Sequence, residues 1–389
     1  MVVVAAVALG AAAPADAGGP ERVASAATVV NVASVEPRPA CGTEHARSAA
    51  PVRPALPPSS VRYASYNFLH ALGTSNASLD ARLPLIVGAI AAAGADVVGA
   101  QEVEELGSRG FTTARVARGL AATTGSAWYW CFFAANPVVP GEPDSLVGGG
   151  GPQSIAIQPI ASGALGETVF RTGVGILSRY PIVASGAKRL PYRVAEDVNA
   201  CPDLPCRLAA TFESRAALRA VVATPRGRVH VVSTHLAHTV TAKSDLSRVA
   251  QNAAMLEWIE AFSAAAPYPV VLTGDFNSVE GSQVHAAVVA AGFVDTFRVA
   301  HPTAGGFTSS QEIDAPGPTV TSRIDYVFAR GAACALARAG RDRSLRVVSS
   351  DVFGDEPGLV GGAPLWPSDH YGVVTSLRTR PSACTGLRR

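Results

Sequence analysis

The sequence predicts a mixed α/β fold with more than one β-sheet. Short apolar runs with strand character alternate along the chain with helical segments. Strand pairs of the hairpin kind interrupt this alternation, which a simple doubly wound sheet would not show. The 389 residues are 48% hydrophobic and 16% charged, a composition that can bury a core of good size.

The first half of the structured region begins with an alternating strand and an Ala-rich helix that Gly94 ends. In chain order, the predicted elements are strand 61–67, helix 83–93, strand 96–100 and helix 112–123. Residues 136–163 carry Asn-Pro, Pro-Gly and a run of glycines, and they predict a long loop.

The second half contains one strong amphipathic helix, which Ser244 or Asp245 can cap and which runs to about Phe262. Before this helix, strands are predicted at 172–178, 216–222 and 228–234. After it come strand 269–273, helix 283–291, and strands 323–329, 346–348 and 373–377. The sequence shows no internal repeat.

The N-terminal region has the composition of an exported protein. Residues 1–17 resemble a secretory signal peptide, with an apolar stretch and a small-x-small site at 15–17, although a positive n-region is missing. The apolar stretch is too short to span a membrane. Residues 18–58, rich in Ala, Pro, Ser and Arg, predict a flexible linker, and 380–389 a tail. The expected location is therefore secreted.

Six cysteines agree with export, because an even count in an oxidising compartment favours disulfides. The pair Cys201 and Cys206 brackets a small proline-containing loop and is the best local candidate. A bridge between Cys41 and Cys384 would join the two ends of the chain. Free buried cysteines are the alternative, and the spacings do not match a zinc site.

Polar side chains follow several of the predicted strands. The segment Gly274-Asp275-Phe276-Asn277 ends an apolar run and presents a carboxylate and a carboxamide two residues apart. Because strand side chains alternate with period two, both can face one point. Similar groups follow three other strand-like runs at Gln101-Glu102, Thr234-His235 and Asp369-His370. Each taken alone is an ordinary turn or loop polarity.

Taken together, these groups suit attack of water on a phosphate ester. Oxygen donors for a hard cation such as Mg²⁺ or Mn²⁺, with Ca²⁺ as a further candidate, are Asn67, Glu102 and Asp369. Asp275 and Asn277 can orient a water molecule. Groups that can move a proton or contact a phosphate oxygen are His235 and His370, and Asp325 can fix one imidazole tautomer.

These segments resemble the endonuclease/exonuclease/phosphatase superfamily. Seven short matches occur in family order at 65–67, 98–102, 173–179, 233–236, 274–277, 323–326 and 368–370. The resemblance implies a four-layer α/β sandwich, two mixed sheets packed face to face with helices on both outer faces. It also implies one domain, over 59–379, where length alone suggests two or three.

The resemblance also implies roles for single residues. Glu102, with Asn67 and Asp369, binds the cation, and Asp275 with Asn277 positions and deprotonates the attacking water. His235 contacts the phosphate. His370 stabilises the transition state and is oriented by Asp325. Arg171, before a predicted strand, is a candidate phosphate contact, with a plain surface arginine as the equal alternative.

The sequence leaves the substrate open among three phosphate esters. A secreted nuclease is the first hypothesis. The net charge is only +2, and the sequence has no basic tract of the kind that binds duplex nucleic acid tightly. A sphingomyelin or phospholipid phosphodiesterase would need an exposed apolar hairpin, which no segment shows clearly. An inositol-phosphate-type phosphatase is third. A binding module that has lost catalysis is the non-enzyme alternative, and a monomer is expected.

Overall fold

The computed structural model describes residues 38–45, 59–70, 79–105, 110–135, 160–162, 167–169, 171–204, 206–207, 214–332 and 345–379. All of them belong to one compact unit, spanning Glu36–Arg389. The predicted signal segment 1–17, the tail 380–389 and most of the loop 136–163 lie outside the described residues. Within the described ranges, no helix has the length and apolar character that crossing a membrane requires.

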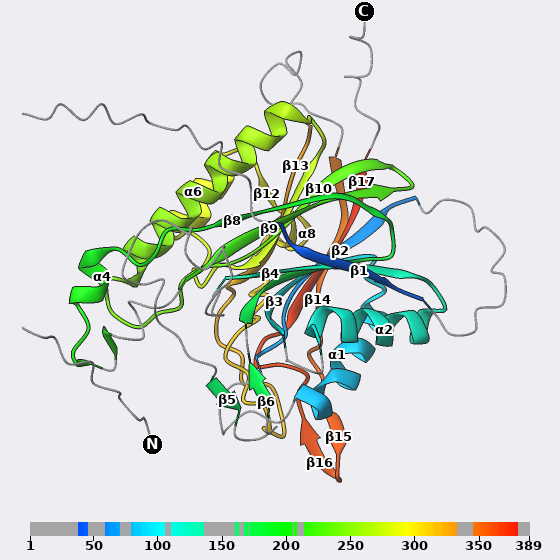
Figure 1. The fold of residues 1–389 in the computed structure, drawn as a ribbon, viewed down its shortest axis with the longest axis horizontal. Coiled ribbons are helices and arrows are strands. Elements are labelled where there is room, and N and C mark those ends of the chain that lie inside the picture. Colours follow the sequence, from blue (N-terminus) through cyan, green and yellow to red (C-terminus); the bar gives the residue numbers. More distant parts are fainter. Residues whose placement is uncertain are drawn as a thin grey trace, which may run out of the picture. The chain divides into compact units, whose positions relative to one another are not determined.

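Two large mixed sheets form the centre of the fold (Figure 1). The seven-stranded sheet has the order β1 (Ala40–Glu44), β4 (Trp128–Ala134), β7 (Arg171–Ser178), β3 (Val97–Glu105), β2 (Val61–Asn67), β17 (Gly372–Thr379) and β14 (Leu345–Phe353). The pair β2–β3 is parallel and its other pairs are antiparallel.

The six-stranded sheet has the order β12 (Val294–Asp295), β13 (Asp325–Arg330), β11 (Val270–Asp275), β10 (Gly227–His235), β9 (Ala216–Thr224) and β8 (Ile182–Arg189). Here only β10–β11 is parallel. Two small hairpins lie outside the large sheets, namely β5 (Ile160–Ser162) with β6 (Glu167–Val169), and β15 (Gly358–Val360) with β16 (Ala363–Leu365).

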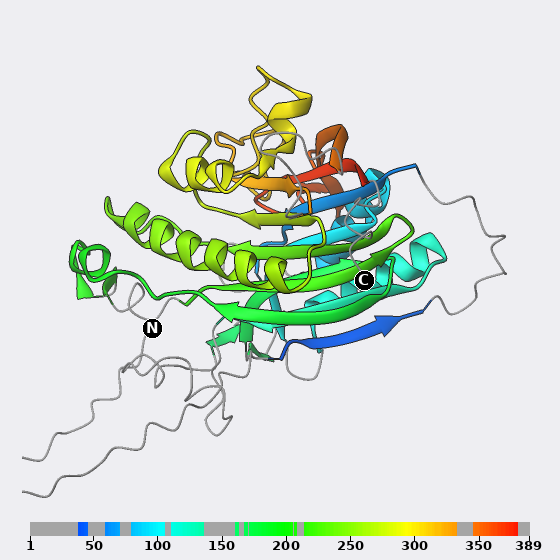
Figure 2. The same cartoon turned by 90° about the horizontal axis from the view of Figure 1, so that it is seen from above.

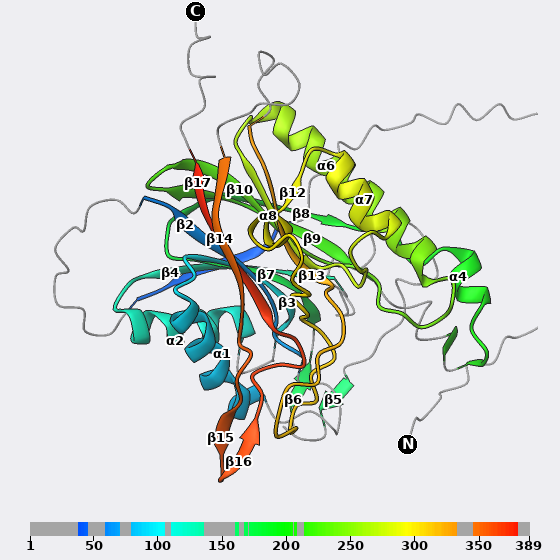
Figure 3. The same ribbon diagram turned by 180° about the vertical axis from the view of Figure 1, so that it is seen from behind.

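Three clusters of buried apolar residues lie between the layers of sheets and helices. The middle cluster contains buried residues from both sheets, such as Tyr63 and Val231, so the sheets pack face to face. A second cluster packs helices α1 (Leu79–Ala93) and α2 (Thr112–Thr124) on the seven-stranded sheet. A third packs α6 (Ser244–Ala265) and α7 (Gln283–Ala290) on the six-stranded sheet. The predicted four-layer sandwich is confirmed (Figures 2 and 3).

The structure contains one disulfide that the sequence predicted and one that it did not. Cys201 and Cys206 are bonded, as predicted, beside the short helix α4 (Ala195–Asn199). Cys41 bonds Cys131 and not Cys384, so that hypothesis is wrong. The two cysteines face each other in the antiparallel pair β1–β4, which places them within bonding reach.

Strand β1 lies inside the segment 18–58 that was predicted to be a linker. For residues 40–44 that prediction is wrong, because backbone pairing with β4 and the Cys41–Cys131 bond hold them in the sheet. Helix α1 likewise begins at Leu79, earlier than the predicted start at 83, because Leu79 and Arg82 are buried against the sheet despite Pro84.

Candidate active site

The predicted site residues come together where inner strands of the two sheets end. In the six-stranded sheet His235 ends β10, Asp275 ends β11 and Asp325 begins the antiparallel strand β13. His235 is registered opposite Asp275, and Asp275 opposite Asp325. The three side chains therefore stand in one row on the same face of the sheet. At Gly274, a Cβ would lie 2.7 Å from the carbonyl oxygen of Thr234, so this close strand approach requires glycine.

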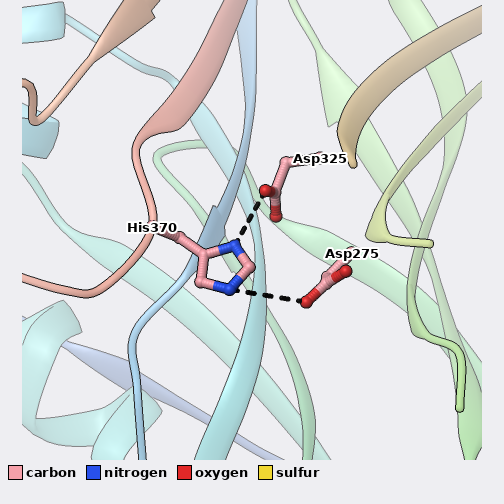
Figure 4. Close-up of side chains that lie close together, drawn as sticks. All are labelled: Asp275, Asp325 and His370. Carbon is pink, nitrogen blue, oxygen red and sulfur yellow. Dashed lines mark hydrogen bonds and ion pairs between the residues drawn. The ribbon is translucent and has the colours of Figure 1, made fainter. Parts of the chain in front are cut away.

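An imidazole lies between the two aspartates of this row (Figure 4). His370 Nδ1 is 2.8 Å from Asp325 Oδ2, and His370 Nε2 is 3.8 Å from Asp275 Oδ2. Thr308 Oγ1 donates to the same Asp325 oxygen at 2.7 Å. Burial opposes the charged imidazole, but the carboxylates of Asp325, Asp275 and Asp369 together outweigh burial and raise the pKa of His370 well above its ordinary value. The predicted Asp325–His370 pair is therefore formed.

Asp275 lies at the centre of the arrangement and is almost fully buried. Its Oδ1 accepts the backbone N–H of Asn277 at 2.8 Å, and its Oδ2 accepts Nδ2 of Asn67 at 3.1 Å. Burial and the charge of Asp325 raise the pKa of Asp275 to about 7, against the opposing effect of His370. A carboxylate with a pKa near neutrality is suited to accept a proton from water.

His235 and Asn277 form the second polar group on this edge. Asn277 Nδ2 is 3.1 Å from His235 Nε2 and donates to the carbonyl of Leu236 at 3.1 Å. Asn277 has φ 49°, a left-handed conformation that asparagine tolerates better than most residues. His235 Nε2 is 3.4 Å from Asp275 Oδ2. His235, Asn277 and Asp275 thus point at one region.

Glu102 reaches the site from the other sheet through a β-bulge. The register of β3 with β7 shifts between Gln101 and Val103, and Glu102 has φ 55°. Such a bulge re-aims a side chain that strand alternation would otherwise turn elsewhere. Glu102 Oε1 accepts Asn67 Nδ2 at 3.1 Å, and Oε2 accepts the backbone N–H of His70 at 3.0 Å.

At this site, the described side chains whose ligand atoms all lie within 4.8 Å of one another are Asp275, Asp325 and His370. The carboxylates of Glu102 and Asp369 are further oxygen donors for a divalent cation. Burial acts to raise the pKa of Glu102, but the imidazoles of His70 and His235 and the two hydrogen bonds lower it overall. Burial raises the pKa of Asp369, and the Glu102 charge adds to that shift. A cation between these carboxylates would relieve their repulsion, and oxygen donors are those that Mg²⁺ and Mn²⁺ bind.

Two of the predicted residues make polar contacts within the protein. The amide oxygen of Asn67 accepts the N–H of Leu69 at 2.9 Å, so its nitrogen faces Glu102 and Asp275. In this conformation Asn67 holds the two carboxylates in place. Arg171 begins β7 opposite Glu105 and forms an ion pair with it.

Sequence reasoning missed three residues of this region. His70, beside Glu102, had only its place three residues after Asn67 as a signal. Thr308 carries no motif, and Ser368 lies in the matched segment 368–370 without a role having been assigned to it. Ser368 Oγ donates to the Asn67 carbonyl at 2.7 Å and accepts the His370 N–H at 3.2 Å, which ties two segments of the site together.

Comparison with known proteins places the fold in a family. The model of the Endonuclease/Exonuclease/phosphatase family matches residues 64–370, which include every predicted site residue. The chain belongs to this family. No curated protein sequence matches it significantly.

Solved structures of family members share the fold. A family protein from Bacteroides thetaiotaomicron superposes with a TM-score of 0.53 at 18% identity, covering 82% of this chain and 94% of its own. A mannosyl-6-phosphatase from the same organism superposes with a TM-score of 0.52 at 18% identity, covering 82% of this chain and 99% of its own. The catalytic domain of human Nocturnin, with bound sulfate, superposes with a TM-score of 0.52 at 17% identity, covering 82% of this chain and 95% of its own. At these identities the likeness concerns the fold. Members of the family are phosphoesterase hydrolases.

Proposed function

We propose that this protein is a secreted, divalent-metal-dependent phosphoesterase that hydrolyses its substrate by in-line attack of water. The observation that carries the proposal is the convergence of Asp275, His235 and the Asp325–His370 pair beside the Glu102 and Asp369 carboxylates. The disulfides Cys41–Cys131 and Cys201–Cys206 are compatible with an oxidising compartment.

In the proposed reaction, Asp275 accepts the proton of the attacking water, and Asn277 helps to orient that water. His370, whose Nδ1 is held by Asp325, donates a hydrogen bond from Nε2 to the charge that develops on the phosphate, and His235 contacts the same group. A cation on Glu102 and Asp369 would supply charge neutralisation at the phosphate when bound. Asn67 Nδ2 donates to the carboxylates of both Glu102 and Asp275 and so orients them.

A nucleic acid is the proposed substrate class, and a positive side chain in the catalytic row supports it. Arg189 is registered opposite Ala216, which is in turn opposite His235. Neighbouring strands lie about 4.8 Å apart, so Arg189 starts roughly 10 Å from His235 on the same face. Its Nη1 donates to the backbone carbonyls of Ala134 at 3.1 Å and Ala135 at 2.9 Å, so the guanidinium would exchange these hydrogen bonds for contacts to a second phosphate of one strand.

The test is hydrolysis of plasmid DNA, single-stranded RNA, sphingomyelin liposomes and small phosphate esters with Mg²⁺ or Mn²⁺, beside the Asp275→Ala variant. We expect nucleic acid cleavage by the wild-type protein, and at least a hundredfold less by the variant. Equal rates for both proteins on every substrate would contradict the hydrolase proposal and favour a binding module that has lost catalysis.

A phospholipid phosphodiesterase is the second candidate, because the structure shows an exposed apolar hairpin that the sequence did not reveal. Hairpin β15–β16 immediately precedes the segment of Asp369 and His370 and projects from the sheets (Figure 1). Leu359 is 78% exposed on it, and Val360 is also exposed. If the substrate is a lipid, Leu359→Asp should abolish liposome binding and leave hydrolysis of a water-soluble ester unchanged.

A further inference from the structure

His70 is a third histidine at the site, and it lies against the carboxylate of Glu102. Its backbone N–H donates to Glu102 Oε2 at 3.0 Å, and its imidazole Nε2 is 3.6 Å from the same oxygen. About a third of the side chain is exposed.

The chain holds His70 in this place with several contacts. Leu69 takes φ 55°, a conformation unfavourable for leucine, and its N–H donates to Asn67 Oδ1 at 2.9 Å. The buried guanidinium of Arg82 donates to the carbonyls of Phe68 at 2.5 Å and Leu69 at 2.6 Å. These contacts turn the chain sharply after β2, so that residue 70 faces the bulge of Glu102.

The distance between His70 and Glu102 is informative. At 3.6 Å, Nε2 and Oε2 are too far apart for a hydrogen bond. Two donors bound to one ion at about 2.1 Å lie roughly 3.0 Å apart in an octahedron and roughly 3.4 Å in a tetrahedron. The observed spacing is near these values, and a small rotation of the His70 side chain would reach them.

We propose that His70 supplies an imidazole ligand to a divalent cation bound by Glu102, and that this ligand makes the site selective for Mn²⁺ over Mg²⁺. Mg²⁺ prefers a shell of oxygen atoms, whereas imidazole favours first-row transition metals. The inference rests on the proposed function, because it concerns the cation of that same site.

Pulsed electron paramagnetic resonance of bound Mn²⁺ tests this ligand directly, since it detects ¹⁴N coupling from a coordinated imidazole. The metal-free full-length protein is loaded with Mn²⁺ alone. We expect ¹⁴N coupling in the wild-type protein, and its loss in His70→Ala and His70→Gln. The control is His238→Ala, which removes an exposed histidine beside Arg215 and should keep the coupling.

Binding titrations with Mn²⁺ and Mg²⁺ provide the second readout. We expect His70→Ala to weaken Mn²⁺ binding at least about tenfold and to change Mg²⁺ binding less than about threefold. His70→Gln, which offers a hard oxygen, should favour Mg²⁺ relative to the wild-type protein. Thermal melts without metal establish that each variant is folded.

The possible failures are distinguishable. If Mn²⁺ binds the wild-type protein but ¹⁴N coupling is absent, or persists in His70→Ala, the imidazole ligand is overturned and the phosphoesterase proposal stands. If neither cation binds the wild-type protein, the metal dependence of the proposed function is overturned together with this inference.

Discussion

At the scale of single residues, Asp275 has a proton affinity that its neighbours determine. Burial and the nearby Asp325 charge raise its pKa to about 7, far above that of an exposed aspartate. A group whose pKa is raised on folding stabilises the protein below the unfolded-state pKa. That contribution is lost as the pH rises through the folded-state value. Above pH 7 the buried Asp275 of the metal-free protein is therefore charged, which lowers the free energy of unfolding.

Asp275→Asn should separate catalysis from stability. The variant cannot accept the proton of water, so kcat should fall about 10²–10⁴-fold. Without metal at pH 8 it should be more stable than the wild-type protein by about 1–3 kcal/mol, because the buried charge is gone. Denaturant unfolding at pH 4.5 and pH 8 measures this gap, which should shrink at the lower pH. An equal gap at both pH values would contradict the assigned cause.

At the scale of elements, helix α1 contributes Arg82 to two segments that are far apart in the sequence. Besides the carbonyls of Phe68 and Leu69, its guanidinium donates to the carbonyl of Pro367 at 3.0 Å. It thereby joins the turn after β2 to the segment that carries His370. Burial lowers the pKa of Arg82, although the nearby Asp369 carboxylate acts against that shift.

Arg82→Met should therefore affect both folding and catalysis. Removal of the guanidinium leaves buried carbonyl oxygens without their donor, which we expect to cost about 2–4 kcal/mol of unfolding free energy. The catalytic rate of the folded fraction should fall as well, because both site segments lose a shared contact. Arg118→Met, at an exposed ion pair with Glu44, is the matched control and should change stability by less than about 1 kcal/mol.

A second network fixes helix α8 (Thr296–Ala300) beside the sheet. Glu280 pairs with Arg298 and Arg323, and Arg323 also pairs with Asp295, whose other partner is His285. Glu280, His285 and Asp295 are close enough to hold a cation, but the two guanidinium groups already neutralise the carboxylates. We interpret this group as structural.

Acid should release this network. The hydrogen bond from Arg298 lowers the pKa of Glu280 to about 2, against a smaller opposing effect of burial. A lowered pKa means that the pair stabilises the protein above the unfolded-state value and that this contribution is lost as the pH falls toward 2. Glu280→Gln should therefore flatten the loss of stability between about pH 4.5 and pH 2. Thermal melts across that range measure it, and parallel curves would refute the assignment.

At the scale of the whole molecule, the Cys41–Cys131 bond closes a long loop. The two residues are 90 positions apart, so the bond restricts the unfolded chain strongly. The Cys41→Ser, Cys131→Ser double variant should lose about 2–4 kcal/mol of stability. Its catalytic rate should stay within about threefold of wild type, since β1 lies at the outer edge of the sheet. Chemical denaturation and initial rates provide the two measurements.

The sequence predicted the parts of this fold that carry strong local patterns. The inner strands β2, β10 and β11 are apolar and end in polar residues, so strand and site could be read together. Strand β1 is short, contains Gly42 and lies at a sheet edge, where backbone pairing and a disulfide decide the structure. Local patterns carry no record of such long-range partners.

The same distinction applies to the candidate site. Asp275, His235 and Asp325 could be predicted because they stand at strand ends in family order. His70 could not, since its place depends on the turn at Leu69 and on a guanidinium from a helix. The bulge at Glu102 was equally invisible, because one extra residue in a strand leaves no mark on apolar periodicity.

The row of Arg189, Ala216, His235, Asp275 and Asp325 spans five strands, and each member is placed only by backbone pairing. A slip of one residue in any of these strands would turn its member of the row to the opposite face of the sheet. A molecule with such a slip would be inactive, and it would also lose stability, because both faces of these strands are buried. Specific activity, compared with the folded fraction seen by circular dichroism, is therefore a sensitive assay of assembly errors in this β-sheet.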